Sequence, residues 1–173
     1  MSKKQRELTQ GIDALPAFPV VLVTVDRNIM TAAAFSFYSF EPSCVMVGIK
    51  TENLTFDLIV ERGEFGINIP SKEQIEEVRV CGSISGRAED KFAVAGLTPL
   101  QGTVIGSSLI AECPVNLECR VVHRVQFGGS HAWFVGQLEA VHIDEGYTRD
   151  QALLFWLGEY RAVGVVLLKS GYE

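Results

Sequence analysis

The chain has 173 residues, a length that suits a single domain with a sizeable core. Its hydrophobic fraction is 47% and its mean hydropathy is +0.20, which favours either a large core or further apolar surface buried in an oligomer. The net charge of -6 argues against a nucleic-acid partner, although local hydrogen-bond donors can still bind a single anionic cofactor.

The first ten residues are polar, and no apolar signal-peptide core follows them. No uninterrupted apolar run is long enough to span a bilayer. We therefore expect a cytoplasmic protein with no membrane partner. The cysteines are Cys44, Cys81, Cys113 and Cys119, without a CxxC pair or a histidine spacing that completes a zinc site. We expect unpaired, mostly buried thiols and no metal site.

Two parts are predicted in the chain: an N-terminal arm over residues 1–15, loose or a short helix, and one domain over residues 16–170. Strands are predicted over residues 20–25, 29–38, 44–50, 65–69, 115–121, 132–143 and 163–168. The alternation of apolar and polar residues from Val115 to Val121 resumes after Gly128-Gly129, which predicts a hairpin of two long strands.

Helices are predicted between the strands, over residues 53–62, 72–80, 90–95 and 148–158. Asn53 and Gly63 suit the start and the end of the first helix. Capping-box spacings, at residues 71–74 and 148–151, suit the starts of the second and the last. The predicted fold class is mainly β with α insertions, a mostly antiparallel sheet closed into a barrel. Periodicity alone chooses neither the barrel type nor the ligand.

The stretch from Asn28 to Ala34 contains the small residues Thr31 to Ala34, and the hydroxyls of Ser36 and Ser39 follow it. In a strand, small side chains let another group approach the backbone, and hydroxyls can donate to a polar ring or a phosphate. Ordinary packing of small side chains is the alternative explanation of this stretch.

A candidate anion site lies from Lys50 to Thr55, at a predicted strand-to-helix junction. Free N–H groups at a helix start, with hydroxyls and a lysine nearby, attract anions. The alternative is that Asn53 and Thr55 only cap the helix and Lys50 is solvated. The segment is not a Walker loop, and the chain contains no GxGxxG.

The segment from Ser83 to Phe92 places Arg87 and Lys91 with several hydroxyls beside a short predicted helix. The alternative is that Asp90 caps this helix, that Lys91 is solvated, and that Arg87 pairs with a neighbouring carboxylate in a contact worth little if exposed.

His131 follows a glycine pair, so we expect it near the surface. One histidine without a partnered serine or cysteine makes no hydrolytic triad. The aromatic residues between Leu154 and Arg161 either cover a flat ring or pack at a helix end.

Taken in order, these segments resemble the flavin reductase-like family of FMN-binding split barrels, and within it the flavoredoxin-like branch. The resemblance covers roughly residues 15–168. The matching residues lie at 18–24, 28–32, 39–42, 63–70, 85–87, 90–92, 96–99, 117–119, 131, 134–136 and 158–160. No single piece is decisive, and the order of the whole set carries the resemblance.

The resemblance implies a split-barrel homodimer with FMN at the subunit interface. The residues implied at the ring are Asn28, Thr31, Ala32, Ala33 and Ser39. Those implied at the 5′-phosphate are Lys50, Asn53 and Thr55, and those on a loop near the flavin are Ser85, Arg87 and Lys91. His131 is the candidate residue near the nicotinamide or flavin pocket, and no residue is assigned as catalytic with certainty.

Some positions depart from the family pattern, beginning with a turn at Asp26-Arg27 that is shorter than usual. Lys50 and Asn53 stand where arginine and threonine are frequent, and a lysine lacks the bidentate fork of arginine. Phosphate affinity, or the preference for FMN over riboflavin, is therefore open. Ser43 replaces a second proline, and the adjacent Cys44 is either a redox-tuning neighbour of the flavin or a buried structural thiol.

The function implied is that of an enzyme, an NAD(P)H-dependent flavin reductase whose substrate is FMN, FAD or riboflavin. The flavin supplies the chemistry, and the protein orients it. Electrons would pass to a monooxygenase or another redox partner. The alternatives are a flavoredoxin-like carrier with tightly bound FMN, and a non-redox split barrel that binds flavin or haem. The choice of NADH or NADPH, the final acceptor, and the status of FMN as substrate or prosthetic group stay open.

Overall fold

The computed structural model describes residues 2–167. Its strands are β1 (Phe18–Pro19), β2 (Val21–Val25), β3 (Asn28–Ala32), β4 (Phe35–Ser39), β5 (Cys44–Lys50), β6 (Glu64–Ile69), β7 (Pro99–Gln101), β8 (Ser108–Ile110), β9 (Val115–Val125), β10 (His131–Ile143), β11 (Leu153–Trp156) and β12 (Glu159–Ala162). Its α-helices are α1 (Leu8–Asp13), α2 (Leu54–Arg62), α3 (Ile75–Ser83) and α4 (Lys91–Ala95), and 3-10 turns lie at Lys72–Gln74 and Arg149–Gln151.

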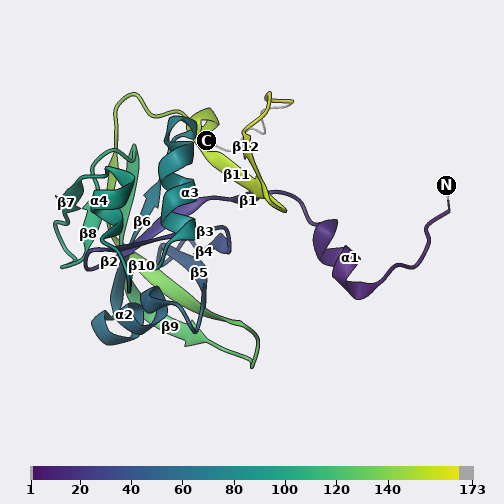
Figure 1. The fold of residues 1–173 in the computed structure, drawn as a ribbon, viewed down its shortest axis with the longest axis horizontal. Coiled ribbons are helices and arrows are strands. Elements are labelled where there is room, and N and C mark those ends of the chain that lie inside the picture. The colour runs from purple at the N-terminus through teal and green to yellow at the C-terminus, as the bar shows by residue number, and fades with distance from the viewer. Residues whose placement is uncertain (1, 168–173) are drawn as a thin grey trace.

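Seven strands form the central antiparallel sheet, in the order β3-β2-β6-β9-β10-β5-β4 (Figure 1). The strands at its two ends, β3 and β4, are consecutive in the chain, and only Ala33 and Ala34 connect them. Such a short link brings the two ends together, so the sheet must curl into a barrel. Among the described residues no ladder pairs β3 with β4, and the barrel therefore stays split.

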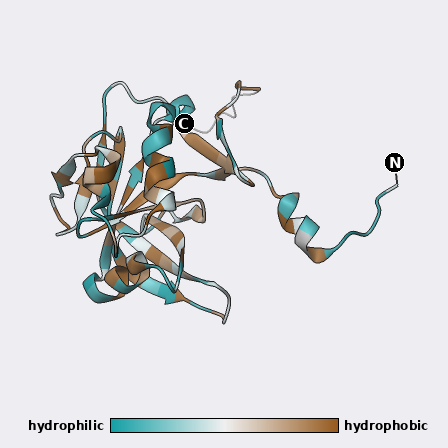
Figure 2. Cartoon of the chain, viewed as in Figure 1, coloured by the Kyte–Doolittle hydropathy of each residue, from teal (hydrophilic) through white to brown (hydrophobic). Residues whose placement is uncertain are grey.

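Strand β2 supplies two cores with alternate side chains, which explains why all five of its residues are buried. Val21, Val23 and Val25 pack in the barrel interior with residues such as Phe65. Leu22 points the other way, into a second cluster that α3, α4 and β11 cover. Figure 2 shows the apolar colour gathered on the strands inside, and Figure 1 shows α3 lying across the barrel.

Buried polar groups in this core are held by hydrogen bonds. Glu118 on β9 is 0% exposed and accepts hydrogen bonds from the backbone N–H groups of Thr103, Val104 and Ile105. His142 Nε2 lies 2.7 Å from the same carboxylate. Burial works to raise the pKa of Glu118, but these hydrogen bonds outweigh it and hold the pKa at about 2. Glu118 thereby fixes the loop before β8 to the sheet.

The N-terminal arm contains α1, which stands away from the barrel in Figure 1. All four cysteines are free and buried, as predicted. Among residues 2–167 no helix has the length and apolar character needed to cross a membrane.

Three predicted elements were wrong. The single strand over 29–38 is two strands, because the chain turns at Ala33-Ala34 from one end of the sheet to the other. The predicted helix over 148–158 is one 3-10 turn followed by the hairpin of β11 and β12, with Leu157 and Gly158 at positive φ in its turn. Residues 163–167 form no strand, and Leu168, like the predicted domain end at 170, lies outside the described residues.

Candidate functional site

Two adjoining cavities, of about 340 and 310 Å³, form one crevice beside β3. The two cavities share Met30, Glu52, Asn53 and Gly82 in their linings, and we call the two together the crevice. Its walls come from β3, from the start of α2, and from the end of α3 with the loop that follows. Segments distant in the sequence therefore meet at this one place.

The start of α2 opens into the larger cavity without a side-chain cap. Asn53 occupies the N-cap position, but within the described chain its side chain donates to Met30 Sδ at 3.2 Å and does not cap the first turn. Leu54 and Thr55 line the cavity at this helix start. Uncapped N–H groups and the positive end of the helix dipole make this part of the crevice attractive to an anion.

Two cationic side chains line the same cavity. Arg87 Nη2 lies 2.5 Å from Asp57 Oδ2 in a half-exposed ion pair between the loop and α2. Lys91 is only 5% exposed, and its Nζ donates to the carbonyl of Cys81 at 2.8 Å. Burial lowers the pKa of Lys91. Both cations sit where they would neutralise a bound phosphate.

Asn28 presents a buried acceptor that has no partner. The residue is 8% exposed and lines the larger cavity, and its Nδ2 donates to Thr55 Oγ1 at 2.8 Å. Its Oδ1 is buried and, among the described residues, accepts no hydrogen bond. Gly86 covers this atom so closely that a Cβ there would lie 1.9 Å from it. An unsatisfied buried oxygen costs about 1–3 kcal/mol, so the site lacks a donor that a ligand can supply.

Small residues form part of the lining of the smaller cavity. Ala33 and Ala34 stand at the end of β3, and a Cβ on Gly82 would meet the Thr31 side chain at 3.2 Å. Strand β3 ends the sheet order, so alternate backbone groups along it have no sheet partner in the described chain. These features suit the edge of a planar ring that carries hydrogen-bonding atoms.

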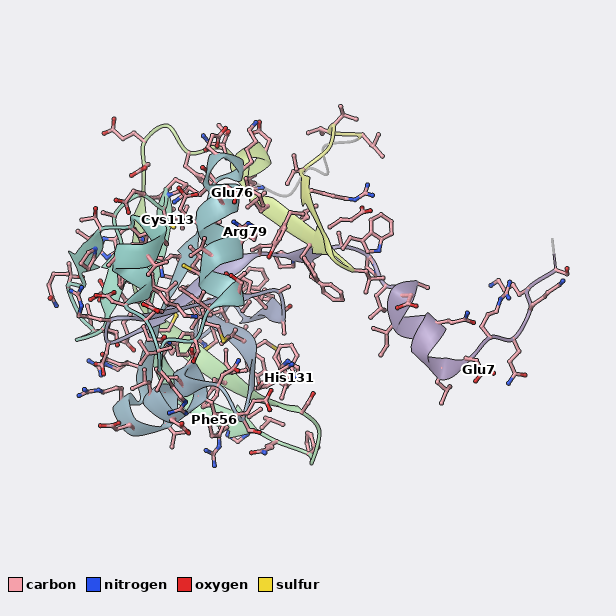
Figure 3. All side chains as sticks on the ribbon, viewed as in Figure 1. Glu7, Phe56, Glu76, Arg79, Cys113 and His131 are labelled. Carbon is pink, nitrogen blue, oxygen red and sulfur yellow. The ribbon has the colours of Figure 1, made fainter. Side chains whose placement is uncertain are left out.

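Lys50 and His131 also line the smaller cavity. Lys50 Nζ is 4.0 Å from Glu52 Oε1, and both side chains are largely exposed. His131 begins β10, where its Nδ1 lies 2.9 Å from Ser130 Oγ, and Figure 3 shows it next to the β9–β10 hairpin. His131 therefore lines the crevice with the hydroxyl of the adjacent Ser130 at its Nδ1.

The structure brings together nearly all the predicted site residues. Those that line the larger cavity are Asn28, Asn53, Thr55, Ser85, Arg87 and Lys91. Those that line the smaller one are Thr31, Ala32, Ala33, Lys50, Asn53 and His131. Ser39 is the exception, because it lies on β4 opposite Cys44 and lines neither cavity. Cys44 is itself buried and lines neither cavity.

Several lining residues were missed from the sequence, among them Met30, Cys81, Gly82 and Gly86. Gly86 could have been predicted, because a glycine between Ser85 and Arg87 allows close approach of another group. Cys81 and Gly82 gave no such indication, since they end an amphipathic helix. Burial raises the pKa of Cys81 to about 11, so the crevice carries a neutral thiol there.

The fold is thus a split antiparallel barrel with a crevice beside β3. The family model described as flavin reductase like domain matches residues 15–164. The chain therefore belongs to the flavin reductase-like family, as the sequence predicted.

Three relatives give the range of similarity. An uncharacterized protein of Archaeoglobus fulgidus is 37% identical over 69% of this chain, and the match spans 66% of its own length, just under two thirds. A protein named NADH-dependent flavin reductase, from a Rhodococcus species, is 29% identical over 78% of this chain and 69% of its own. The solved flavoredoxin of Desulfovibrio vulgaris (Miyazaki F) is 31% identical with a TM-score of 0.85, over 99% of this chain and 98% of that one. The predicted fold class, a mainly antiparallel split barrel, is confirmed.

Proposed function

We propose that this chain binds FMN in the crevice and acts as an oxidoreductase of the flavin reductase type. The observation that carries the proposal is the pairing of an uncapped helix start with an unsatisfied buried amide oxygen at Asn28. A phosphate would bind at the uncapped helix start. The N–H of a planar ring would donate the hydrogen bond that the side-chain oxygen of Asn28 lacks. The cations Arg87 and Lys91 line the same cavity.

FMN, when bound, would supply the redox chemistry for hydride and electron transfer from NADH or NADPH to an acceptor. The residues of this chain hold and orient it. The start of α2, Thr55, Ser85, Arg87 and Lys91 would hold the phosphate. Asn28 and the backbone from Thr31 to Ala33 would hold the polar edge of the ring. Lys50, which the resemblance implied at the phosphate, lines the smaller cavity and not the larger one, and there it would place a positive charge near the ring. His131 would stand beside the bound nicotinamide.

A flavoredoxin-like electron carrier is the second candidate. The observation that favours it is the 31% identity to a flavoredoxin over 99% of this chain. In a carrier, FMN stays bound and a protein partner delivers the electrons. The crevice residues would be the same in both functions, because they fix the flavin and not its electron donor.

We further propose that the chain forms a homodimer that completes the flavin site. Strand β4 ends the sheet next to the smaller cavity, and Phe37, Tyr38 and Phe40 on it and its turn are exposed, Phe40 by 80%. An exposed edge strand with clustered aromatic side chains is typical of an interface. A dimer at micromolar concentration in light scattering is the expected result, and a monomer would contradict the proposal.

The proposed function also bears on the domain boundary, the partners and the cellular location of the chain. The family match to residues 15–164 supports one domain from residue 16 onward, with the first fifteen residues as an arm. The expected partners are a nicotinamide donor and either a monooxygenase or another redox protein, and the expected location is the cytoplasm.

The test is titration of the purified protein with FMN, FAD and riboflavin, followed by anaerobic addition of NADH or NADPH. Rapid loss of the visible flavin absorbance supports the reductase. Tight retention of FMN through gel filtration with slow nicotinamide oxidation supports the carrier. A colourless protein that does not quench FMN fluorescence would refute both, and it would leave a non-redox split barrel, for which haem is the next ligand to try.

A further inference from the structure

The hairpin of β9 and β10 extends past the sheet that holds it. Pairing of β10 with β5 ends at His131, and pairing of β9 with β6 ends at Arg120. Residues 122–130 therefore have no strand beside them except their own partner in the hairpin, and Figure 1 shows the hairpin projecting from the barrel. We call residues 122–133 the hairpin tip.

The hairpin tip carries an apolar surface that nothing in the described chain covers. Phe127 is 94% exposed and Val122 is 53% exposed. Beside Phe127 lies a cavity of about 360 Å³, whose walls include Val125 and Trp133. The Trp133 ring is held in place on β5, where a Cβ on Gly48 would lie 3.1 Å from it. A large exposed aromatic side chain next to a preformed hollow is typical of a protein–protein contact.

The charge of the hairpin tip differs from that of the rest of the chain. The chain has 21 acidic residues and a net charge of -6, yet none of these residues lies from Cys119 to Leu138. Arg124 is exposed, forms no ion pair among the described residues, and lies 5.9 Å from the centre of the Phe56 ring on α2. Lys50 adds a second cation at the base of the tip, 4.0 Å from Glu52. The tip is therefore a locally positive area on an acidic protein.

The hairpin tip also lies directly beside the crevice. His131 lines both the cavity of the tip and the smaller cavity of the crevice, and Figure 3 shows it at the base of the hairpin. A protein docked on the tip would lie next to the site where the proposed function puts the flavin ring. Because the rate of electron transfer falls steeply with distance, this place suits a redox partner.

The hairpin tip is separate from the surface proposed for the dimer. Strand β4, with the exposed aromatic residues at Phe37 and Tyr38, pairs with the part of β5 from Cys44 to Val47. The tip begins at the other end of β5, beyond Lys50. Since β5 has seven residues, its two ends lie roughly 20 Å apart. A second copy bound along β4 would therefore leave the tip available to another protein.

We propose that the hairpin tip docks an electron-transfer protein that is acidic at its contact surface. The inference rests on the proposed function, because such a partner needs a flavin in the crevice. Phe127 and Trp133 form the apolar centre of the contact, and Arg124 and Lys50 attract the opposite charge. Because most of this acidic chain repels an acidic partner, the tip also orients that partner toward the crevice. A membrane is less favoured, since two cations on a chain of net charge -6 attract anionic lipids weakly.

The experiment is titration calorimetry of the protein, with and without FMN, with an acidic plant-type ferredoxin at low and high salt. We expect binding that weakens about tenfold at high salt, because the attraction is between exposed charges. Stopped-flow mixing then measures electron transfer in the FMN-loaded protein. Each of two reduced ferredoxin molecules gives one electron to the bound flavin, protons come from water, and the loss of flavin absorbance gives the rate.

The variants Arg124→Glu and Phe127→Ser should each weaken ferredoxin binding and slow the transfer about tenfold. Arg149→Glu is the matched control for charge, because it makes the same change in net charge at an exposed residue of the second 3-10 turn. Val94→Ser, at a residue 52% exposed on α4, is the control for lost apolar surface. Each control should change binding less than about twofold. Circular dichroism, light scattering and FMN titration of every variant report on its folding, its oligomeric state and the crevice.

Absence of ferredoxin binding by the wild type, or equal binding by the wild type and both tip variants, would overturn the docking surface. A monomer from either tip variant would also overturn it, because the tip would then be a contact between copies of this chain. So would binding to vesicles of phosphatidylserine and phosphatidylcholine that Phe127→Ser abolishes. FMN binding without ferredoxin binding leaves the proposed function standing, whereas ferredoxin binding by a protein that takes up no FMN refutes that function and keeps the surface.

Discussion

The ion pair between Arg87 and Asp57 sets up a sharp test of the phosphate site, because the same guanidinium cannot serve both partners fully. Asp57 lies on α2 and Arg87 on the loop across the larger cavity. If the cavity receives a phosphate, Asp57 competes with it for Arg87. Asp57→Asn removes this competitor and a negative charge near the anion, so FMN should bind more tightly.

The size of the effect follows from the exposure of the pair. Both side chains are about half exposed, and such pairs are worth roughly 0.2–1 kcal/mol, which corresponds to an increase in FMN affinity of about 1.4- to fivefold. Riboflavin has no phosphate, so its affinity should stay unchanged. Higher salt should reduce the difference, because it screens exposed charges.

Fluorescence-quenching titrations of FMN and riboflavin, at low and high salt, measure this directly. Asp150→Asn is the control, since Asp150 is exposed in the second 3-10 turn and lines neither cavity of the crevice. An equal gain for riboflavin and FMN, or a weaker FMN complex, would refute a phosphate at Arg87.

Three further predictions concern the crevice and the core. Asn28→Ala should weaken FMN binding about tenfold in the same titration, because it removes the acceptor for the ring. It should also lower the free energy of urea unfolding by about 1–2 kcal/mol, because it removes the hydrogen bond to Thr55. Unchanged FMN affinity would contradict the role of Asn28. Gly86→Ala should lower the unfolding free energy by about 1–3 kcal/mol, because its Cβ would strike Asn28 Oδ1, whereas Gly129→Ala, where a Cβ meets open space, should not. Glu118 has a folded pKa of about 2 against an ordinary 4.5, so the stability that its ionised form contributes is complete above pH 4.5 and is lost as the pH falls toward 2. The unfolding free energy of Glu118→Gln should therefore depend less steeply on pH over that range than that of the wild type. An identical pH dependence would refute the low pKa of Glu118.

The strands with a clear period of two were predictable because one face of each meets the core. Thus β9 and β10 lie close to the predicted 115–121 and 132–143. The hairpin of β11 and β12 was not, because a short apolar run such as Leu153 to Trp156 fits a helix and a strand equally well. Its pairing with β1, over a hundred residues earlier in the chain, decides between them, and no local pattern records that contact.

The candidate site was predictable to the extent that its residues occur in motifs with a chemical meaning. Lys50, Asn53 and Arg87 stand out by charge or capping position, and all three line the crevice. Ser39 was placed at the ring by the family resemblance, but β4 carries it away from both cavities. Cys81 and Gly82 could not be chosen, because the end of an amphipathic helix is ordinary until the fold places it beside β3.

The two-residue link between β3 and β4 gives the crevice a rigidity that does not depend on any ligand. The backbone that would meet the ring is tied at Ala33-Ala34 to the opposite end of the same sheet, so it cannot swing outward unless the barrel itself opens. A cofactor would then enter a surface that is already shaped, and little of its binding energy would be lost to ordering the chain. Lengthening this link by one residue would loosen that surface while leaving the interior packing untouched.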